Sequence, residues 1–460
     1  MKSIFTVLLA LAGFAAGQSP SPQVALKPPA LNLKDGDRWV FIGDSITHQC
    51  QYTQYVENFY FTRHPEKRIH FRNAGISGDR AADVLNRFDD DIAAFKPTIA
   101  TVLLGMNDGS YKDFDAAVFK TYSDDMLKLM DKLDALKCRV ILMSPTMFDH
   151  QAWEKRIKEK PEYAKGRVPS NYNAVLAYYG KWLQEVAQQR GYRYVDLFGP
   201  LNTLTVLQRQ SNPDFTLVPD AIHPEADGQF VMAYSLLQQC GEVGPVMSAG
   251  VKILNGSWAA GNRAIVSEVS GEPGRTVTYT AKPSALPWAE FVDCPIGTKL
   301  TKSGHQGGSE SHVVVGLQPG YYDLVVNGSV VGTYDEKMLG VHAEVQEDLD
   351  SPTCQQALKV LELNKKRNDE AVRPMRGIYA QRKGKLRAAN AEGGDKAAFT
   401  AWWDENKKVA DELSAKADAM AEEIRKINVP PVLKVEIRPG KAPVRKAAPK
   451  ASPKLKAKSA

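Results

Sequence analysis

The first half of the chain alternates between two hydrophobic patterns. Short, mainly apolar runs predict buried strands at residues 38–42, 69–73, 98–104, 139–143 and 194–197. Between them, apolar residues recur at helical spacing and predict helices at residues 53–64, 81–95, 113–136, 173–190 and 226–239. Strands that alternate with helices are typical of a parallel sheet with helices on both faces. We therefore expect an α/β domain with a five-stranded parallel sheet over residues 36–246.

Residues 147–169 interrupt this alternation after the fourth predicted strand. The segment carries Phe148, Trp153 and Tyr163 among many Lys and Glu residues. Because it leaves the carboxyl end of a strand, it is compatible with a wall of a substrate site. A solvated surface helix is an equally good interpretation of the same pattern.

The pattern changes twice beyond residue 246. Residues 247–345 lose the helical spacing and gain Gly, Ser, Thr and Val, which predicts a small β-rich region. Within it, Asn327-Gly328 lies between two apolar runs and predicts a β-hairpin with a type I′ turn. Helical spacing returns over residues 346–431 and is interrupted at Gly393-Gly394. This pattern predicts a C-terminal helical hairpin.

The two ends of the chain differ from its body in composition. Lys2, the apolar run at 4–16 and the small residues that follow predict a signal peptide at residues 1–17, before a Pro-rich lead-in at 18–35. The apolar run is short for a membrane span, so we expect an exported protein that is periplasmic, cell-surface or secreted. A Lys/Ala/Pro tail at residues 432–460 is predicted to be disordered.

The formal net charge of +6 is concentrated in this tail. Residues 441–458 contain seven Lys and Arg residues and no Asp or Glu, so the rest of the chain is close to neutral. A near-neutral body gives no electrostatic reason to expect nucleic-acid binding. The tail is compatible with contact to an anionic cell envelope or with a solubilising role. The sequence leaves the oligomeric state open.

Four polar motifs lie where the predicted sheet would present a ligand site. A Gly-Asp-Ser motif ending at Ser45, a motif containing Gly78 and a Gly-x-Asn motif ending at Asn107 follow the first three strands. The carboxyl ends of parallel strands share one sheet edge, so we expect these residues to gather there. An Asp-x-x-His motif, Asp220 to His223, precedes the last helix and supplies a base with a carboxylate partner.

These four motifs, in this order, resemble those of the SGNH hydrolases, also called the GDSL esterase/lipase family. The resemblance covers about residues 36–242, and the Leu of the older family name is replaced by Ile in this chain. It implies a three-layer α/β/α, flavodoxin-like fold. It further implies Ser45, Asp220 and His223 as catalytic residues, and an oxyanion hole formed by Ser45, Gly78 and Asn107.

On this basis we expect an exported serine esterase that hydrolyses carboxylic esters through an acyl-enzyme. The expected partner is a small-molecule or glycan ester, and the preferred reaction is removal of acetyl or other small acyl groups from carbohydrates. A lipase or lysophospholipase of the same fold and a non-catalytic envelope scaffold are the alternatives. No cofactor is expected. The histidines show no metal-ligand spacing, including those at positions 150, 305, 312 and 342.

The remaining ionisable residues receive structural interpretations. Asp44, Asp79 and Asp108 are expected to hold loops through side-chain to backbone hydrogen bonds. The run at residues 89–91, three consecutive Asp residues, is expected to lie on a solvated helix face. The five cysteines suggest no disulfide framework, and Cys138 is expected to be buried.

Overall fold

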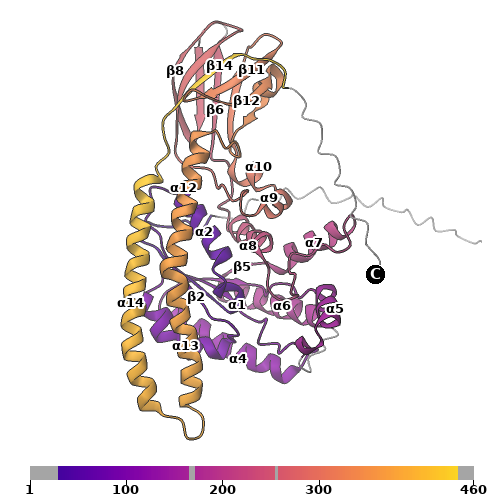
Figure 1. The fold of residues 1–460 in the computed structure, drawn as a ribbon, viewed down its shortest axis with the longest axis vertical. Coiled ribbons are helices and arrows are strands. Elements are labelled where there is room, and N and C mark those ends of the chain that lie inside the picture. Colours follow the sequence, from indigo (N-terminus) through magenta and orange to yellow (C-terminus); the bar gives the residue numbers. More distant parts are fainter. Residues whose placement is uncertain (1–29, 165–170, 254–256, 444–460) are drawn as a thin grey trace, which may run out of the picture.

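The computed structural model describes residues 30–164, 171–253 and 257–443. The predicted signal peptide and most of the basic tail lie outside the described residues. Figure 1 shows an α/β domain, a β-rich region at one end of it, and two long helical segments that run along its side. No helix in these ranges is both long enough and apolar enough to cross a membrane.

The α/β domain is built on the predicted five-stranded parallel sheet, and its strands have the order β2-β1-β3-β4-β5. Its strands are β1 (Arg38–Gly43), β2 (His70–Gly75), β3 (Ile99–Leu103), β4 (Arg139–Met143) and β5 (Arg193–Val195). The helices that flank it are α1 (Ser45–His48), α2 (Gln51–Arg63), α3 (Ala81–Leu85), α4 (Ala116–Ala135), α5 (His150–Glu159), α6 (Tyr172–Arg190), α7 (Phe198–Arg209) and α8 (Ala226–Gln239). The sheet with its flanking helices is a flavodoxin-like α/β fold.

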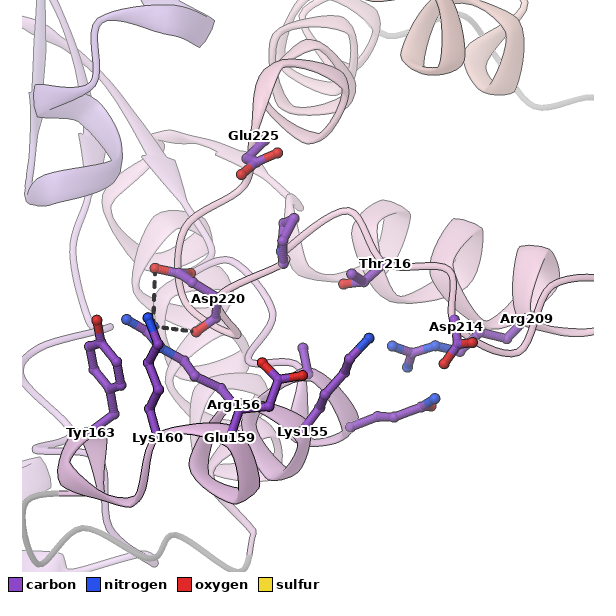
Figure 2. A pocket seen from close by; sticks show the side chains of 13 residues that line it. Lys155, Arg156, Glu159, Lys160, Tyr163, Arg209, Asp214, Thr216, Asp220 and Glu225 are labelled. Atoms are coloured by element: carbon purple, nitrogen blue, oxygen red, sulfur yellow. Dashed lines mark hydrogen bonds and ion pairs between the residues drawn. The ribbon is translucent and has the colours of Figure 1, made fainter. Parts of the chain in front are cut away.

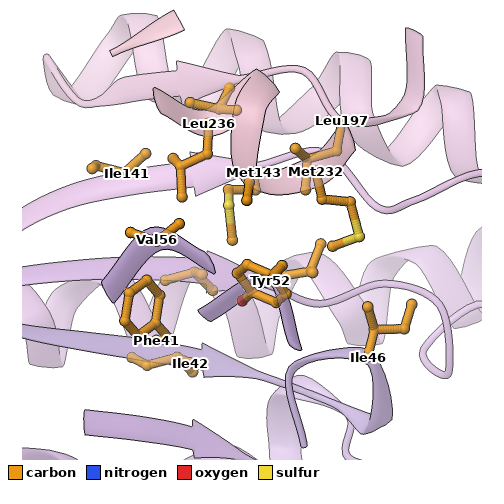
Figure 3. Close-up of a cluster of buried hydrophobic side chains, with 14 of the residues drawn as sticks. Phe41, Ile42, Ile46, Tyr52, Val56, Ile141, Met143, Leu197, Met232 and Leu236 are labelled. Carbon is orange, nitrogen blue, oxygen red and sulfur yellow. The ribbon is translucent and has the colours of Figure 1, made fainter. Parts of the chain in front are cut away.

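The core of this domain joins the sheet to α2 and α8. Figure 3 shows Phe41 of β1 and Met143 of β4 among side chains of both helices. The Phe41 ring meets the Tyr52 ring edge-on, with 6.1 Å between their centroids. Each of these side chains is buried, and full burial of one large apolar side chain contributes about 1.5–3 kcal/mol. Helix α2 is buried along nearly its whole length, because the C-terminal helices cover its other side.

The helix predicted over residues 81–95 is divided. It continues after α3 as a π-helical turn at Phe88–Ile92 and a 3₁₀ turn at Ala93–Phe95. The expectation of a solvated face is wrong for Asp91, which is fully buried. Its carboxylate pairs with three guanidinium groups, two of them within the α/β domain and the third from the C-terminal helices. The sequence did not reveal this burial because the three cations come from separate elements.

The β-rich region contains two sheets. A four-stranded sheet has the order β13-β10-β6-β7, and a five-stranded sheet has the order β12-β11-β14-β9-β8. The strands are β6 (Met247–Ile253), β7 (Ser257–Asn262), β8 (Ala264–Ser270), β9 (Val277–Pro283), β10 (Glu310–Val315), β11 (Tyr321–Val326), β12 (Ser329–Asp335), β13 (Ala343–Glu344) and β14 (Leu433–Pro439). Short helices α9 (Pro295–Thr301), α10 (Ser303–Gly308) and α11 (Glu336–Val341) complete the region.

In this region one sequence expectation is confirmed, the β-hairpin, and another is wrong in part, the disorder of the C-terminal tail. The predicted hairpin is present between β11 and β12, and both turn residues have positive φ, 49° at Asn327 and 90° at Gly328. The expectation of disorder from residue 432 onward is wrong for residues 433–439, which form β14. Three alternating apolar side chains of β14 are buried while the strand pairs with β11 and β9, so the β-rich region is completed by the far end of the chain.

The C-terminal helices form the predicted hairpin. Its first arm comprises α12 (Pro352–Arg367), a π-helical turn at Asn368–Val372 and α13 (Arg373–Ala389), and its second arm is α14 (Lys396–Ile427). Figure 1 shows both arms beside the α/β domain. Asn364, Arg367 and Asn368 of the first arm donate hydrogen bonds to the Glu57 carboxylate of α2 at 2.8–3.1 Å. The hairpin is therefore fixed to the domain by buried polar contacts as well as apolar ones.

All five cysteines lie in the described ranges, where they are buried and form no disulfide. The expectation that Cys138 is buried is confirmed, and this burial raises the pKa of its thiol to about 12.

Candidate active site

The ends of the three neighbouring strands β2, β1 and β3 are level. Gly43 pairs with both Gly75 and Leu103 in the strand register, so the loops that follow start from the same sheet edge. Gly75 allows the end of β2 to pass close to α1, since a Cβ there would lie 2.4 Å from the backbone nitrogen of His48. Ser45, Gly78 and Asn107 all lie a few residues beyond these strand ends.

Ser45 begins the short helix α1 and is partly exposed. The carboxylate of Asp44 caps this helix by accepting a hydrogen bond from the Ile46 backbone at 2.9 Å. Burial, together with the neighbouring carboxylate of Asp108, raises the pKa of Asp44 to about 7. Asp108 itself accepts hydrogen bonds from the backbones of Ala81 and Gly105. The loop-holding roles expected for Asp44 and Asp108 are confirmed.

A chain of hydrogen bonds links Ser45, His223 and Asp220. The Ser45 Oγ lies 2.8 Å from Nε2 of His223, and Nδ1 of the same ring lies 2.7 Å from the Asp220 carboxylate. Asp220 also accepts backbone hydrogen bonds from Ile222 and His223 at 2.9 and 2.6 Å. Burial alone would raise the pKa of Asp220, but the hydrogen bonds and the charge of His223 outweigh it and lower that pKa to about 2.

The turn between Asp220 and His223 has a strained backbone and is held by hydrogen bonds from Asp149 and Arg156. Ala221 has φ of +75°, a left-handed conformation that is rare outside glycine and costs on the order of 1–3 kcal/mol. The Asp149 backbone donates to the Ala221 carbonyl at 3.0 Å. Arg156 of α5 donates to the Asp220 carbonyl at 2.9 Å and lies 3.4 Å from its carboxylate. Figure 2 shows Arg156 between the helix and this turn.

The amide of Asn107 has a fixed orientation. Its Nδ2 group donates to the Asp79 carbonyl at 3.1 Å and lies 3.4 Å from the Asp44 carboxylate. Its Oδ1 atom accepts a hydrogen bond from the Tyr111 hydroxyl at 2.9 Å. The N–H donors of Asn107 therefore face the loops that carry Ser45 and Gly78.

The loop around Gly78 is held by residues from two directions. Gly78 is exposed and has φ of +71°, which places it in the left-handed region. On one side, the Ser77 backbone donates to Nδ1 of His48 at 3.2 Å. Burial, and then the nearby Arg376, lower the pKa of His48 to about 4, so its ring is neutral at neutral pH. On the other side, the Lys383 ammonium of α13 lies 2.8 Å from the Asp79 carboxylate.

Three of these positions escaped the sequence analysis: Tyr111, Arg156 and Lys383. Arg156 and Lys383 each act on a site loop from an element distant in the chain. Tyr111 lies four residues beyond Asn107, and none of the three belongs to a motif. No periodicity or spacing in the sequence marks them.

A cavity of about 410 Å³ lies beside Asp220. Most of the residues that line it are charged or polar, and they come from α5, the 3₁₀ turn that follows it, the end of α7 and the loop before α8: Gln151, Ala152, Lys155, Arg156, Glu159, Lys160, Tyr163, Arg209, Asp214, Thr216, Pro219, Asp220 and Glu225. The segment that interrupts the strand–helix alternation therefore borders the site, while its Trp153 side chain is buried.

Comparisons with known proteins find similarity to ester hydrolases. Residues 41–230 match the model of the GDSL-like Lipase/Acylhydrolase family. An acetylxylan esterase of Geobacillus stearothermophilus is 23% identical over 233 residues, which is 46% of this chain and 97% of that protein. An isoamyl acetate-hydrolyzing esterase 1 homolog of Mus musculus is 28% identical over 133 residues, 28% of this chain and 49% of that protein.

One solved structure resembles most of the chain, including the β-rich region and the helical hairpin. It is a gut microbial diltiazem-metabolizing enzyme with a TM-score of 0.74 and 25% identity, and the likeness covers 90% of this chain and all of the other. The α/β domain thus carries the family match, and the accessory regions occur in another enzyme. Through residues 41–230 the chain is similar to the GDSL-like lipase/acylhydrolase family, and it is a serine hydrolase that acts on ester bonds.

Proposed function

We propose that Ser45 is the nucleophile of this hydrolase, with His223 as its general base and Asp220 as the carboxylate that orients the base. The observation that carries this assignment is the unbroken hydrogen-bond chain from the Ser45 hydroxyl through the imidazole to Asp220. With Nδ1–H directed at Asp220, Nε2 accepts the Ser45 proton as the oxygen attacks the ester carbonyl. Asp220 stays ionised, because its pKa is about 2.

The negative charge of the tetrahedral intermediate requires preorganised donors. In this proposal the backbone N–H groups of Ser45 and Gly78 and the side-chain amide of Asn107 supply them. His223 then protonates the leaving alcohol, and an acyl-Ser45 ester remains. Water that loses a proton to His223 attacks this ester, releases the acid and restores the serine.

The proposed substrate class is a carbohydrate that carries acetyl or other small acyl groups. The polar lining of the cavity beside Asp220 suits a hydroxyl-rich alcohol better than a lipid chain. The acetylxylan esterase among the relatives supports the same substrate class. We also propose that the protein is exported, on the strength of the N-terminal apolar run alone.

The nucleophile assignment is tested by a fluorophosphonate probe and a short-chain ester. Wild-type protein should be labelled and Ser45→Ala should be neither labelled nor active, while Ser123→Ala, which removes a serine hydroxyl from α4, should match the wild type. Ester hydrolysis by Ser45→Ala at the wild-type rate would exclude Ser45. Absence of labelling in folded wild-type protein would favour the scaffold alternative.

The substrate class is tested separately by comparing kcat/KM on acetylated oligosaccharides with kcat/KM on acyl esters of increasing chain length. We expect the highest values for acetylated oligosaccharides and a decline as the acyl chain lengthens. A rising series would favour a lipase or lysophospholipase without changing the assignment of Ser45. Export is tested by cell fractionation, in which deletion of residues 1–17 should retain the protein in the cytoplasm.

A further inference from the structure

A cluster of three metal-ligating side chains lies in the β-rich region. His305 is on α10, His342 follows α11, and Glu344 is on β13. One potential ligand atom from each lies within 4.8 Å of the other two. The positions did not suggest a site in the sequence, because His305 is far from the other two along the chain and the fold joins them.

The two ligand distances to Glu344 suit a small divalent ion. One carboxylate oxygen of Glu344 lies 2.6 Å from Nδ1 of His305 and 3.4 Å from Nε2 of His342. Zinc binds imidazole nitrogen and carboxylate oxygen at about 2.0–2.2 Å, so tetrahedral ligand atoms lie roughly 3.3 Å apart. The His342–Glu344 distance already has this value, and the His305–Glu344 pair needs to open by less than 1 Å at a partly exposed site.

The Glu344 carboxylate is oriented by neighbouring side chains, as metal ligands commonly are. Its second carboxylate oxygen accepts a hydrogen bond from the Gln346 amide at 3.0 Å, which leaves the first oxygen directed at the two imidazole rings. Such outer contacts orient metal ligands in proteins. Glu347 adds a second carboxylate beside α10, where Gly304 leaves room for it, since a Cβ at Gly304 would lie 2.0 Å from the Glu347 carboxylate. Burial and the charge of Glu344 raise the pKa of Glu347.

The cluster lies at a junction between the β-rich region and the hydrolase domain. Helix α10 is bound to that domain by Arg63 of α2, which donates to the Gly307 carbonyl at 2.7 Å. Gln306 of α10 accepts a hydrogen bond from Tyr234 of α8 at 3.1 Å. A metal ion shared by α10 and β13 would tie the four-stranded sheet to the same helix.

We propose that His305, His342 and Glu344 form a zinc-binding site that clamps the β-rich region onto the hydrolase domain. Imidazole and carboxylate ligands match the preferences of Zn²⁺. The ion replaces the His305–Glu344 hydrogen bond: a neutral His305 ring then carries its proton on Nε2, and a protonated ring releases one proton to solvent. The site is outside the proposed ester-hydrolysing machinery, and its role is structural.

The test uses the full chain with any purification tag removed and with metal stripped by a chelator. Titration calorimetry with Zn²⁺ should give one site per chain, and zinc should raise Tm by about 2–5 °C at saturation. His305→Ala and Glu344→Gln should each weaken binding by about 100-fold or more and abolish the Tm shift. Gln346→Leu should weaken binding by about 10–100-fold.

The matched control is His70→Ala, because His70 also faces a carboxylate, 3.7 Å away on Asp418, but belongs to no group of three possible metal ligands among the residues that the structure describes. This variant should bind zinc like the wild type. Each variant's Tm in chelator shows whether it folds, and Glu344→Gln preserves the shape of the side chain if His305→Ala does not fold. Absence of one-site binding in the wild type, or equal loss in His70→Ala, would overturn the proposal.

Discussion

Replacing Arg376 with Met tests how the helical hairpin is joined to the hydrolase domain. Arg376 of α13 and Asp91 of the α/β domain are both fully buried. Their contact is bidentate, with N–O distances of 2.7 and 2.8 Å. Arg87 lies 2.6 Å from the same carboxylate and Arg72 lies 3.4 Å away, so the substitution removes the one partner that comes from the hairpin.

The expected loss in the free energy of unfolding is about 3 kcal/mol. Breaking a buried pair by removing one partner costs about 3–5 kcal/mol. We expect the lower value here, because Arg87 and Arg72 still pair with the Asp91 carboxylate in the variant. The matched control is Arg387→Met on the same helix, where the side chain is 77% exposed and its ion pair with Asp83 is 4.0 Å long. This control should change stability by no more than about 0.5 kcal/mol.

The measurement is chemical denaturation of the full chain at neutral pH, followed by circular dichroism. The charge and hydrogen bonds of Arg376 hold the pKa of Asp91 well below its usual value of 3.8, against the effect of burial. The stabilisation is therefore fully present above pH 3.8 and is lost as the pH falls below it, so the difference between Arg376→Met and the wild type should shrink in acid. A loss below about 1 kcal/mol, or one equal to that of Arg387→Met, would refute the proposed role of this contact.

Three further predictions concern the proposed active site. Asn107→Ala should lower kcat by about 10²–10³-fold with little change in Tm, because it removes an oxyanion donor; unchanged kcat would exclude that role. Asp220→Asn should lower kcat by about 10³–10⁴-fold, because the amide no longer fixes the tautomer of His223. In wild-type protein, Asp220 has a pKa of about 2. The stability that its ionised form contributes is therefore fully present above pH 3.8 and is lost as the pH falls toward 2. Activity lost near pH 5 should not come from protonation of Asp220. Lys383→Met should lower kcat by on the order of 10-fold, with KM nearly unchanged, because the Gly78 loop loses its contact through Asp79, and Lys383→Arg should restore part of that loss.

The parallel sheet was predictable because each strand carries its own signal. The run around Phe41 is continuously apolar, which is typical of a strand that is buried on both faces of a parallel sheet. The motif residues Ser45, Gly78 and Asn107 were predictable together because strand ends in a parallel sheet share an edge. The hairpin turn at Asn327 followed from a local rule on positive φ.

Other features depend on partners that local patterns do not mark. Asp91 belongs to an acidic run that is typical of a solvated face, yet it is buried because three arginines converge on it. Strand β14 lies at the start of a Lys- and Pro-rich tail, and its burial depends on pairing with β11 and β9 more than one hundred residues earlier.

The sequence by itself determined the fold of the hydrolase domain and pointed to the side chains that we propose as reactive, because strand periodicity and short motifs are encoded locally. Only the tertiary structure decided how those side chains are held. Arg156 at Asp220 and Lys383 at Asp79 reach the site from α5 and α13, and His305 of α10 meets Glu344 of β13. The partners in these contacts are far apart in the sequence and share no motif, so they interact only when the chain has folded.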